Sequence, residues 1–371
     1  MLNQGLLNDA AASYQISGFQ QFVDRHDIEL EGLLMVDVTE ARGVHVDEDE
    51  ETDRLNEVDG RRARLGINGD ISRRLKAELS LDFDIEESTT SLHEVSLSYE
   101  STQNINLDAG LIKQPFGLEG STSSKRLRPL ERSIASDAFV PDRAWGLLLS
   151  QHFDKAFIGF GAFVDEDNND DAIDFTARAV WSPIKNDQAV LHFGVNGSYR
   201  DPRGDDFRLR SNGSVFTGDN FVRSDRFFPQ SVTTTGLEGA LAIGSLLIQA
   251  EWFYQSLELD DADAVQPEFS GAYVQVGWIF GQGRRKYDGR RFGKTAKGNR
   301  PGNLELIGGF STADLRYLSS ADQADEYTLG VNYEIAKNLG VSAQVQYVEL
   351  LSNNEIVEEG EAAQLRFVAT W

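Results

Sequence analysis

Apolar and polar residues alternate along most of this chain with a period of two, the period of a β-strand whose two faces meet different surroundings. In RLKAELSLDFD, residues 74–84, every leucine lies on one face, while Lys76 and Glu78 lie on the other. The C-terminal QLRFVATW repeats this arrangement, with Phe367 on the apolar face and Arg366 on the polar face. We therefore expect a structure that consists mainly of strands.

The alternating segments number about sixteen, and each spans about ten residues, the length with which a tilted strand crosses a bilayer. Their cores are residues 28–38, 61–69, 74–84, 91–100, 103–112, 143–152, 155–164, 173–182, 189–199, 236–243, 246–257, 269–279, 303–316, 327–335, 339–349 and 362–371. Tight turns are expected at 70–73, 101–102, 153–154, 183–188, 244–245 and 336–338, and longer loops at 39–60, 113–142, 200–235 and 351–361. This pattern predicts an all-β transmembrane antiparallel β-barrel with short periplasmic turns and long extracellular loops.

A soluble β-sandwich or a β-solenoid is the alternative fold, because strands alternate there as well. Two features favour the barrel. Aromatic residues such as Tyr99 and Trp252 recur near the ends of the apolar faces, as in the girdles at lipid headgroups. The polar faces carry charges, which a wide, water-filled lumen can hydrate. The barrel requires Leu79, Val345 and Phe367 to face lipid.

The expected domain organisation is simple. Residues 28–371 are expected to form a single barrel domain that contains a constriction loop, residues 113–142, and follows an N-terminal periplasmic segment, residues 1–27. No apolar run approaches the ~18 residues of a membrane-spanning helix. No secretory signal is present either, so we expect that one was removed from a protein of the bacterial outer membrane.

The composition excludes several functions. The chain has 60 acidic and 35 basic residues, a formal charge of -25, which argues against nucleic acid as a partner, since nucleic acid requires basic surface. It has no cysteine and five isolated histidines, so neither a metal site nor a cofactor is expected. Catalytic motifs such as GxSxG and HExxH do not occur, and we expect no enzyme. An outer-membrane hydrolase with a Ser–His pair is the remote alternative.

One long loop departs from the acidic composition. Residues 113–142 and their flank carry Lys113, Lys125, Arg126, Arg128, Arg132 and Arg143. If this loop folds into the lumen, its bases create a positive field at the narrowest point, where low-dielectric walls focus the field and concentrate anions. Alternatively, the bases form structural ion pairs with acids of the loop or with Glu78 and Glu94 across the lumen. Both interpretations can hold, for different residues.

The stretch RRARL, residues 61–65, adds three more bases. If Leu65 faces lipid, strand geometry places Arg62 and Arg64 on the lumen face. Arg61 then belongs to the opposite face, at the extracellular start of the strand, and reaches the lumen only by bending inward from the rim. We predict that these arginines contribute to the electrostatic field of the lumen.

A second basic cluster, GRRKYDGRRFGKTAKGNR at residues 283–300, falls at the periplasmic end, where turns should be short. It either enters the lumen as a second gate or forms a solvated periplasmic patch, and we favour the patch. Two acidic runs, residues 47–53 and 165–171, are expected in solvated extracellular loops. The loop at residues 200–235 is a further candidate to narrow the vestibule.

Three stretches resemble one known family. They are residues 60–84, residues 107–134 with the runs PFGLE, TSSK and LER, and the terminal strand. All three are similar to the phosphate- and polyphosphate-selective porins, O and P type, of Gram-negative outer membranes, most densely over residues 60–165. The resemblance implies a homotrimer of barrels whose third extracellular loop folds into the lumen, with a ladder of bases that guides anions to this constriction.

The resemblance also assigns residues. The paired arginines of the family's RRA motif fall on Arg61 and Arg62, the lysine of TSSK on Lys125, and the arginine of LER on Arg132. The chain departs from the family at four positions. Gly120 replaces the family's lysine after GLE, and His93 replaces an acidic residue of its binding site. Arg64 and Lys113 replace tyrosines near the constriction. These departures leave the solute class open.

We therefore predict an outer-membrane porin through which small anions, phosphate or polyphosphate among them, diffuse passively. Its expected surroundings are membrane lipid, lipopolysaccharide and two further copies of the chain. The candidate residues for guiding anions are Arg61, Arg62, Arg64, Lys113, Lys125, Arg126, Arg128 and Arg132. The alternative is a general or cation-preferring porin, because Glu78, Asp82, Glu94 and Glu251 are also expected to face inward.

Overall fold

The computed structural model describes most of the chain. The described residues are 25–44, 54–85, 88–164, 173–202, 205–213, 215, 221–261, 263–281, 283–296, 302–318, 323–352 and 355–371. The acidic runs at 47–53 and 165–171 lie outside them, and so does the N-terminal segment up to residue 24. The first strand begins at Glu29, close to the expected start of the barrel domain.

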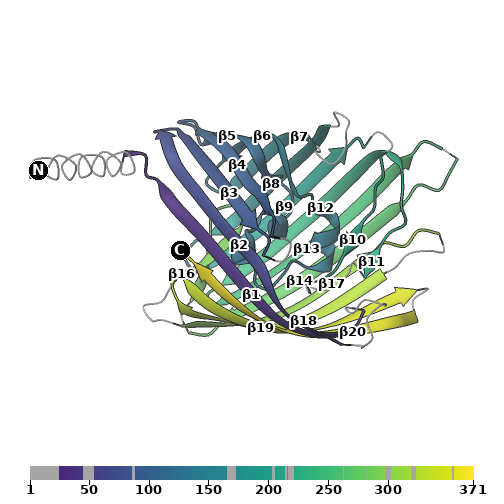
Figure 1. The fold of residues 1–371 in the computed structure, drawn as a ribbon. Coiled ribbons are helices and arrows are strands. Elements are labelled where there is room, and N and C mark those ends of the chain that lie inside the picture. Colours follow the sequence, from purple (N-terminus) through teal and green to yellow (C-terminus); the bar gives the residue numbers. More distant parts are fainter. Residues whose placement is uncertain are drawn as a thin grey trace, which may run out of the picture.

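Sixteen strands form one antiparallel sheet that closes into a barrel, in which β1 and β20 lie side by side (Figure 1). The strands are β1 (Glu29–Gly43), β2 (Leu55–Ser72), β3 (Leu75–Phe83), β4 (Thr90–Glu100), β5 (Ile105–Lys113), β6 (Arg143–His152), β7 (Ala156–Val164), β8 (Ile173–Lys185), β9 (Ala189–Arg200), β12 (Pro229–Ile243), β13 (Leu246–Leu259), β14 (Glu268–Ile279), β17 (Asn303–Asp314), β18 (Gln323–Ala336), β19 (Leu339–Ser352) and β20 (Glu355–Thr370). The prediction of a closed all-β barrel with about sixteen strands is confirmed.

The two faces of the sheet are oriented as the alternation predicts. Leu79, Val345 and Phe367 are 41%, 52% and 47% exposed on the outer surface. Arg366, the neighbour of Phe367, points into the barrel and is buried there. A soluble sandwich would bury the apolar residues in a dry centre. This structure instead exposes an apolar exterior of the kind that a bilayer covers.

The barrel closes where β1 meets β20. The register pairs Leu33 with Thr370 and Asp37 with Arg366. At the end of this seam, the backbone N–H of Gly32 donates to Trp371 at 3.0 Å, and that of Trp371 donates back at 3.2 Å. The indole of Trp371 covers Gly32 so closely that an added Cβ would lie 1.9 Å from the ring. Closure pairs the backbone groups that an open sheet edge would leave exposed.

Several strands extend further toward the long-loop end than the alternation indicated. The largest extensions are in β1, β2, β12, β18 and β20. Parts of the predicted loops are therefore strand, as in EIVEEGE, residues 355–361. These extensions are mostly polar and carry only scattered apolar residues such as Val58 and Ile356, because beyond the bilayer the outer face meets water rather than lipid. Period-two alternation is absent there, which explains why the predicted strands were too short.

The remaining elements lie in connecting segments. They are α2 (Leu118–Ser121), η1 (Ser124–Arg126), α3 (Ile134–Phe139), the small sheet of β10 (Arg210–Ser211) with β11 (Val222–Arg223), and the hairpin of β15 (Arg284–Tyr287) with β16 (Phe292–Ala296). Among the described residues, no helix is both long enough and apolar enough to cross a bilayer. The lengths of α2, η1 and α3 suit loop segments that pack inside the barrel.

Candidate functional site

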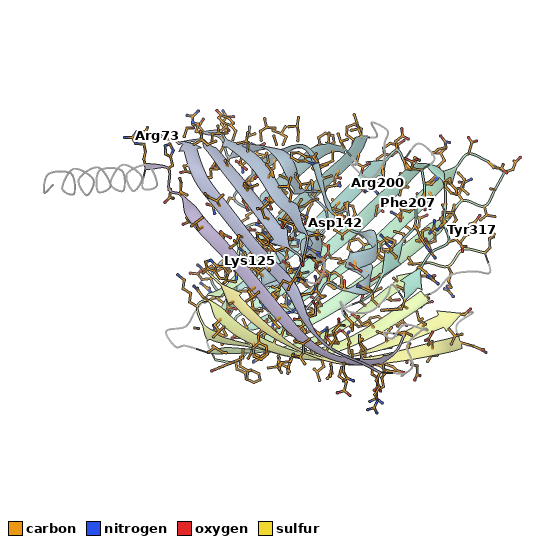
Figure 2. All side chains as sticks on the ribbon, viewed as in Figure 1. Arg73, Lys125, Asp142, Arg200, Phe207 and Tyr317 are labelled. Carbon is orange, nitrogen blue, oxygen red and sulfur yellow. The ribbon has the colours of Figure 1, made fainter. Side chains whose placement is uncertain are left out.

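The segment between β5 and β6 crosses the interior of the barrel. It starts and ends at one point of the wall, because Lys113 at the end of β5 pairs with Arg143 at the start of β6. Figure 2 shows Lys125 and Asp142 of this segment between Arg73, in a tight turn at one end of the barrel, and Tyr317, beside a long loop at the other. We call residues 114–142 the constriction loop.

The constriction loop reaches the opposite wall, where a carboxylate holds it. Glu251 of β13 accepts hydrogen bonds from the backbone N–H groups of Leu118 and Glu119 at 2.6 and 2.8 Å. Tyr273 of β14 donates its hydroxyl to the same carboxylate at 2.5 Å. Gly117 adopts φ +67°, and a Cβ there would lie 2.9 Å from the carboxylate oxygen. Glycine thus allows the backbone turn and the close approach to Glu251.

Further contacts hold the loop along its length. The backbone N–H of Leu130 donates to Gln344 of β19 at 3.0 Å, and that of Ala135 donates to Ser311 of β17 at 3.1 Å. Apolar residues complete the attachment, as Phe116 stacks on Phe253 with ring centroids 6.0 Å apart. The loop is therefore attached to the wall from β13 to β19, and a cavity along β1 to β6 remains open beside it.

The segment between β9 and β12 packs on the constriction loop, which defines a path that the sequence did not predict. Phe207, Leu209 and Phe227 join the apolar cluster that contains Phe139 of α3. The hydroxyl of Ser211 in β10 also donates to Asp137 of α3 at 2.7 Å. The expectation that residues 200–235 narrow the vestibule agrees with this position.

The hairpin β15–β16 enters the lumen from the turn end, so the solvated periplasmic patch that we favoured for residues 283–300 is wrong for the described part, residues 283–296. Phe292 is buried against Leu118 of the constriction loop and Leu247 of the wall. Arg291 donates to the backbone carbonyl of Ser121 at 2.5 Å. The physical reason is that burial of aromatic residues and charge-assisted hydrogen bonds to carbonyls stabilise the inserted hairpin.

A buried polar network anchors the hairpin to the wall. Arg178 of β8 binds Glu238 of β12 with both arms of its guanidinium, at 2.7 and 2.6 Å, and donates to the carbonyl of Arg290 at 2.9 Å. His192 lies between Glu238 and the hydroxyl of Tyr287, at 3.1 and 2.7 Å. Because each charge in this network has an opposite partner, the network stabilises the inserted hairpin without adding net charge to the lumen.

The largest cluster of candidate residues surrounds Glu131 of the constriction loop. Arg61 donates to this carboxylate at 2.9 and 3.0 Å, and Arg62 does so at 3.1 and 2.9 Å. Arg366 of β20 binds Glu131 at 2.7 Å and Asp37 at 2.6 and 2.5 Å. Burial alone would raise the pKa of Glu131, but the attraction of the three arginines outweighs burial and holds the pKa well below its usual value.

The predicted orientation of Arg61, on the outer face and at the rim, is wrong. β2 begins at Leu55, so Arg61 lies well inside the strand. The pairing of β1 with β2 shifts between Met35, which faces Arg62, and Asp37, which faces Asp59. This β-bulge inserts one extra residue in β2 and aims two consecutive arginines at the lumen.

Two more candidate residues and two residues near them pair with acids of the wall. Arg64 binds Asp82 at 2.6 and 2.7 Å, and His93 lies 3.0 Å from the same carboxylate. Lys125 binds Glu31 at 2.6 Å. In the same region, Arg143 binds Glu94 at 3.1 Å. These pairs reduce the net charge that the bases contribute to the lumen.

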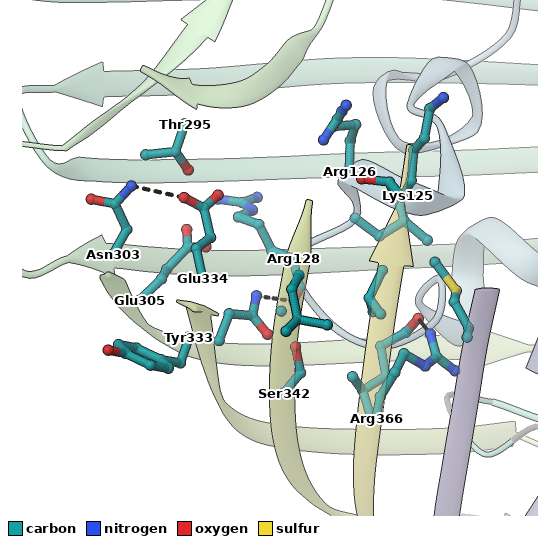
Figure 3. A pocket seen from close by; sticks show the side chains of 18 of the residues that line it. Lys125, Arg126, Arg128, Thr295, Asn303, Glu305, Tyr333, Glu334, Ser342 and Arg366 are labelled. Carbon is teal, nitrogen blue, oxygen red and sulfur yellow. Dashed lines mark hydrogen bonds between the residues drawn. The ribbon is translucent and has the colours of Figure 1, made fainter. Parts of the chain in front are cut away.

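Arg128 is buried and bound to neutral groups. It donates to the carbonyl of Leu247 at 3.2 Å and to the side chain of Gln275 at 3.4 Å. Burial, followed by the like charge of Arg285, lowers the pKa of Arg128 to about 10, so Arg128 stays protonated at neutral pH. It lines a cavity of about 150 Å³ between the constriction loop and strands β17 to β20 (Figure 3).

Besides Arg128, three candidate bases have no carboxylate partner within the described ranges. Lys113 donates to the backbone carbonyls of Gly120 and Thr122, both at 2.8 Å. The side chains of Arg126 and Arg132 form no hydrogen bond or ion pair with the described residues, and Nε of Arg132 is buried without an acceptor. No direct contact with a carboxylate therefore neutralises the positive charges of Arg126 and Arg132.

Arg366, Arg178, Arg285 and Arg291 take part in the site but were not among the candidate residues. Each lies far along the chain from the constriction loop that it helps to hold. The alternation in the terminal strand already placed Arg366 on the lumen face, so Arg366 could have been included among the candidates. For Arg285 and Arg291 the sequence offered only basic charge in an unusually long periplasmic connection.

Comparison with known proteins identifies the family. Residues 28–369 match the family described as phosphate-selective porin O and P. The chain therefore belongs to this family, and it is a β-barrel porin of the outer membrane. Porin O of Pseudomonas aeruginosa is 27% identical over 352 residues, which cover 81% of this chain and 79% of that protein.

Solved structures share the fold at low identity. The outer membrane channel DcaP of Acinetobacter baumannii superimposes with a TM-score of 0.60 at 12% identity, covering 93% of this chain and 97% of that one. An anion-selective porin from Comamonas acidovorans gives 0.59 at 11% identity, covering 93% and 99%. OmpT of Vibrio cholerae, in a trimer form, gives 0.56 at 14% identity, covering 93% and 99%. At these identities the likeness concerns the fold alone.

Proposed function

We propose that this protein is a passive outer-membrane channel for small anionic solutes, phosphate-like anions among them, and that it works as a homotrimer without catalysis. Membership of the phosphate-selective porin family supports the solute class. The anion-selective porin of similar fold and the trimeric OmpT add weaker support. The geometry of the lumen adds an argument that does not depend on these relatives.

The observation that carries the proposal is a group of bases beside the open part of the lumen. Arg132, Arg143 and Arg291 lie close enough to Lys113 to repel its charge. Neither Lys113 nor Arg132 contacts a carboxylate in the described structure. Such a group creates a positive potential, which low-dielectric walls focus at the constriction. We assign anion guidance to Lys113, Arg132 and Arg126, and attachment of the loop to Arg61, Arg62 and Arg128.

A cation-preferring porin has less support from the inward-facing acids. Asp82 is bound to Arg64, Glu94 to Arg143, and Glu251 to the backbone of the constriction loop. Of the four acids on which that alternative depended, Glu78 alone has no hydrogen bond or ion pair with a described residue. Asp82 and Glu94 attract few cations because each is paired with an arginine.

Phosphate itself requires a separate argument. The family's lysine after the GLE run corresponds to Gly120, and a Cβ at this position would lie 2.4 Å from a methyl group of Val140. A lysine fits here only if Val140 moves. We therefore propose that phosphate binds through Lys113 and Arg132 rather than through a base at position 120.

The test is the ion selectivity of the purified protein in planar bilayers. In a gradient of KCl, the proposed function predicts a reversal potential on the anion-selective side. Phosphate added to one compartment should reduce the chloride current. A reversal potential on the cation-selective side would refute the proposal, whatever the effect of phosphate.

Trimer formation is tested separately. Mild crosslinking in detergent should yield a species of three chains that remains after dilution. A protein that conducts anions but stays monomeric would contradict the trimer and leave the channel function intact.

A further inference from the structure

A second cavity, of about 440 Å³, lies between β1 to β6, the constriction loop and the inserted hairpin. Charges of both signs line it: the acids Glu31, Glu78, Glu94 and Asp108, and the bases Arg64, Lys113, Lys125, Arg143, Arg290 and Arg291. Serine and asparagine side chains fill the spaces between them on the strand wall. A cavity that served simple anions alone would not need acids on its wall.

Several of these charges cancel in pairs. Lys125 binds Glu31 at 2.6 Å, and Arg143 binds Glu94 at 3.1 Å. Arg64 binds Asp82, just outside the cavity. The paired acids are therefore engaged in structural ion pairs. Only the charged groups outside these pairs are available to bind a solute.

Two acids remain without such a partner. Neither Glu78 nor Asp108 forms a hydrogen bond or ion pair with its side chain anywhere in the described ranges. Glu78 faces Ser96 across the sheet, and Asp108 faces Ser98, so both lie on one patch of the wall formed by β3, β4 and β5. The patch lies in the half of these strands that is nearer to the tight turns.

Bases approach this patch without contacting it. Glu78 interacts electrostatically with Lys125 and Arg143, and Asp108 does so with Arg290 of the hairpin. No ion pair joins either acid to these bases. Opposite charges that face each other across a gap leave room for a solute that completes both sets of contacts.

We propose that this cavity binds solutes that carry an ammonium group together with a phosphate or carboxylate group, with Glu78 and Asp108 accepting the ammonium. The anionic group binds Lys113 and the neighbouring arginines. This inference rests on the proposed anion channel and narrows its solutes to zwitterionic and aminated anions. Each end of such a solute forms charge-assisted hydrogen bonds, which are stronger than neutral ones.

The experiment compares two blockers of chloride current in bilayers at neutral pH. The probes are 2-aminoethyl phosphate and ethyl phosphate, which share the phosphate group and differ by the ammonium. We expect 2-aminoethyl phosphate to block the wild-type channel at about fivefold lower concentration, the factor expected for one ion pair in a hydrated site. Equal blocking concentrations in the wild-type channel would overturn the inference.

The variant Glu78→Gln/Asp108→Asn removes both acids with little change of volume. The preference for 2-aminoethyl phosphate should disappear, while ethyl phosphate should block as well as before or better. A preference that survives in this variant also overturns the inference. If the double variant fails to insert into bilayers, each single variant should lower the preference by part of the full factor.

A matched control is Glu355→Gln, which removes one carboxylate at the exposed start of β20. This control should keep the wild-type preference between the two probes. The reversal potential, measured on the same membranes, separates the two proposals. A cation-selective channel contradicts the proposed function, whereas an anion-selective channel with equal block by both probes contradicts only the inference about aminated solutes.

Discussion

Two groups of basic side chains lie in the same lumen and differ in what accepts their hydrogen bonds. Arg61, Arg62 and Arg366 converge on the carboxylate of Glu131, with distances between 2.7 and 3.1 Å. Lys113, in contrast, donates to two backbone carbonyls, and Arg132 has no hydrogen bond or ion pair among the described residues.

Basic residues in this lumen therefore serve two purposes. A buried guanidinium whose charge is matched by a carboxylate holds the constriction loop in place, and it contributes little to the potential that a solute meets. A charged base that contacts only neutral groups still creates a positive electrostatic potential around it, and this potential attracts anions. Charge composition alone does not distinguish the two groups, because the distinction depends on the position of one acid.

The largest expected effect comes from removing that acid. Glu131→Ala leaves the arginines around it without their shared carboxylate. We expect a loss of about 3–5 kcal/mol in the free energy of unfolding, as for other buried ion pairs that lose one partner. Urea unfolding in lipid vesicles measures the loss. Single-channel records should also show a larger and noisier conductance, because the loop detaches from β2 and β20.

The control for Glu131→Ala is Glu355→Gln at the exposed start of β20, which should change stability by less than about 0.5 kcal/mol. The pH dependence provides a further check. Because the pKa of Glu131 is depressed in the folded protein, its contribution is present above the ordinary value of 4.5 and is lost only as the pH falls through the depressed value. The wild-type conductance should therefore persist at pH 4.

Arg291 belongs to neither group, because it binds both a carboxylate and a backbone carbonyl. It binds Asp288 of its own hairpin at 3.2 Å and also donates to the carbonyl of Ser121 at 2.5 Å. Arg291→Ala should cost about 1.5–3 kcal/mol, the range for hydrogen bonds to charged groups. The measurement is again urea unfolding. A loss as small as that of an exposed residue would indicate that the hairpin does not support the constriction loop.

The bases without carboxylate partners should affect transport rather than stability. Lys113→Gln together with Arg132→Gln should lower the ratio of chloride to potassium permeability about fivefold at low salt, from Coulomb energies near 1 kcal/mol in hydrated surroundings. Reversal potentials in a KCl gradient measure the ratio. The unfolding free energy should change less than in Glu131→Ala.

A charge-neutral pair is the matched control for this variant. Lys125→Gln/Glu31→Gln removes one base and one acid that are bound to each other at 2.6 Å. Its permeability ratio should stay close to that of the wild-type channel. If this ratio decreases as much as in the Lys113 and Arg132 variant, paired and unpaired bases contribute equally to anion preference.

The smallest effect is expected from salt. Raising KCl from 0.1 M to 1 M shortens the Debye length from about 10 Å to about 3 Å, so the field of Lys113 and Arg132 is screened. Anion preference of the wild-type channel should fall about twofold to threefold. Unfolding of the barrel should respond less, since the buried pairs around Glu131 are shielded from solvent ions.

Local sequence patterns were sufficient to predict the barrel. Alternation in segments such as residues 74–84 and 362–371 is a local property, because a bilayer outside and water inside impose a period of two on each strand. The sequence also showed that the loop after Lys113, the third connection at the extracellular end, is basic. Strand ends such as Leu55 and Glu355 escaped prediction, because both faces of a strand beyond the bilayer meet water.

Which bases are neutralised depends on contacts between segments that are distant in the sequence. The bulge that aims Arg61 inward depends on the pairing of β1 with β2, and the contact of Arg366 with Glu131 joins residues 235 positions apart. Entry of the hairpin β15–β16 into the lumen likewise depends on partners such as Arg178, which are distant in sequence. Electrostatic fields follow distances in space, and closure of the barrel sets those distances.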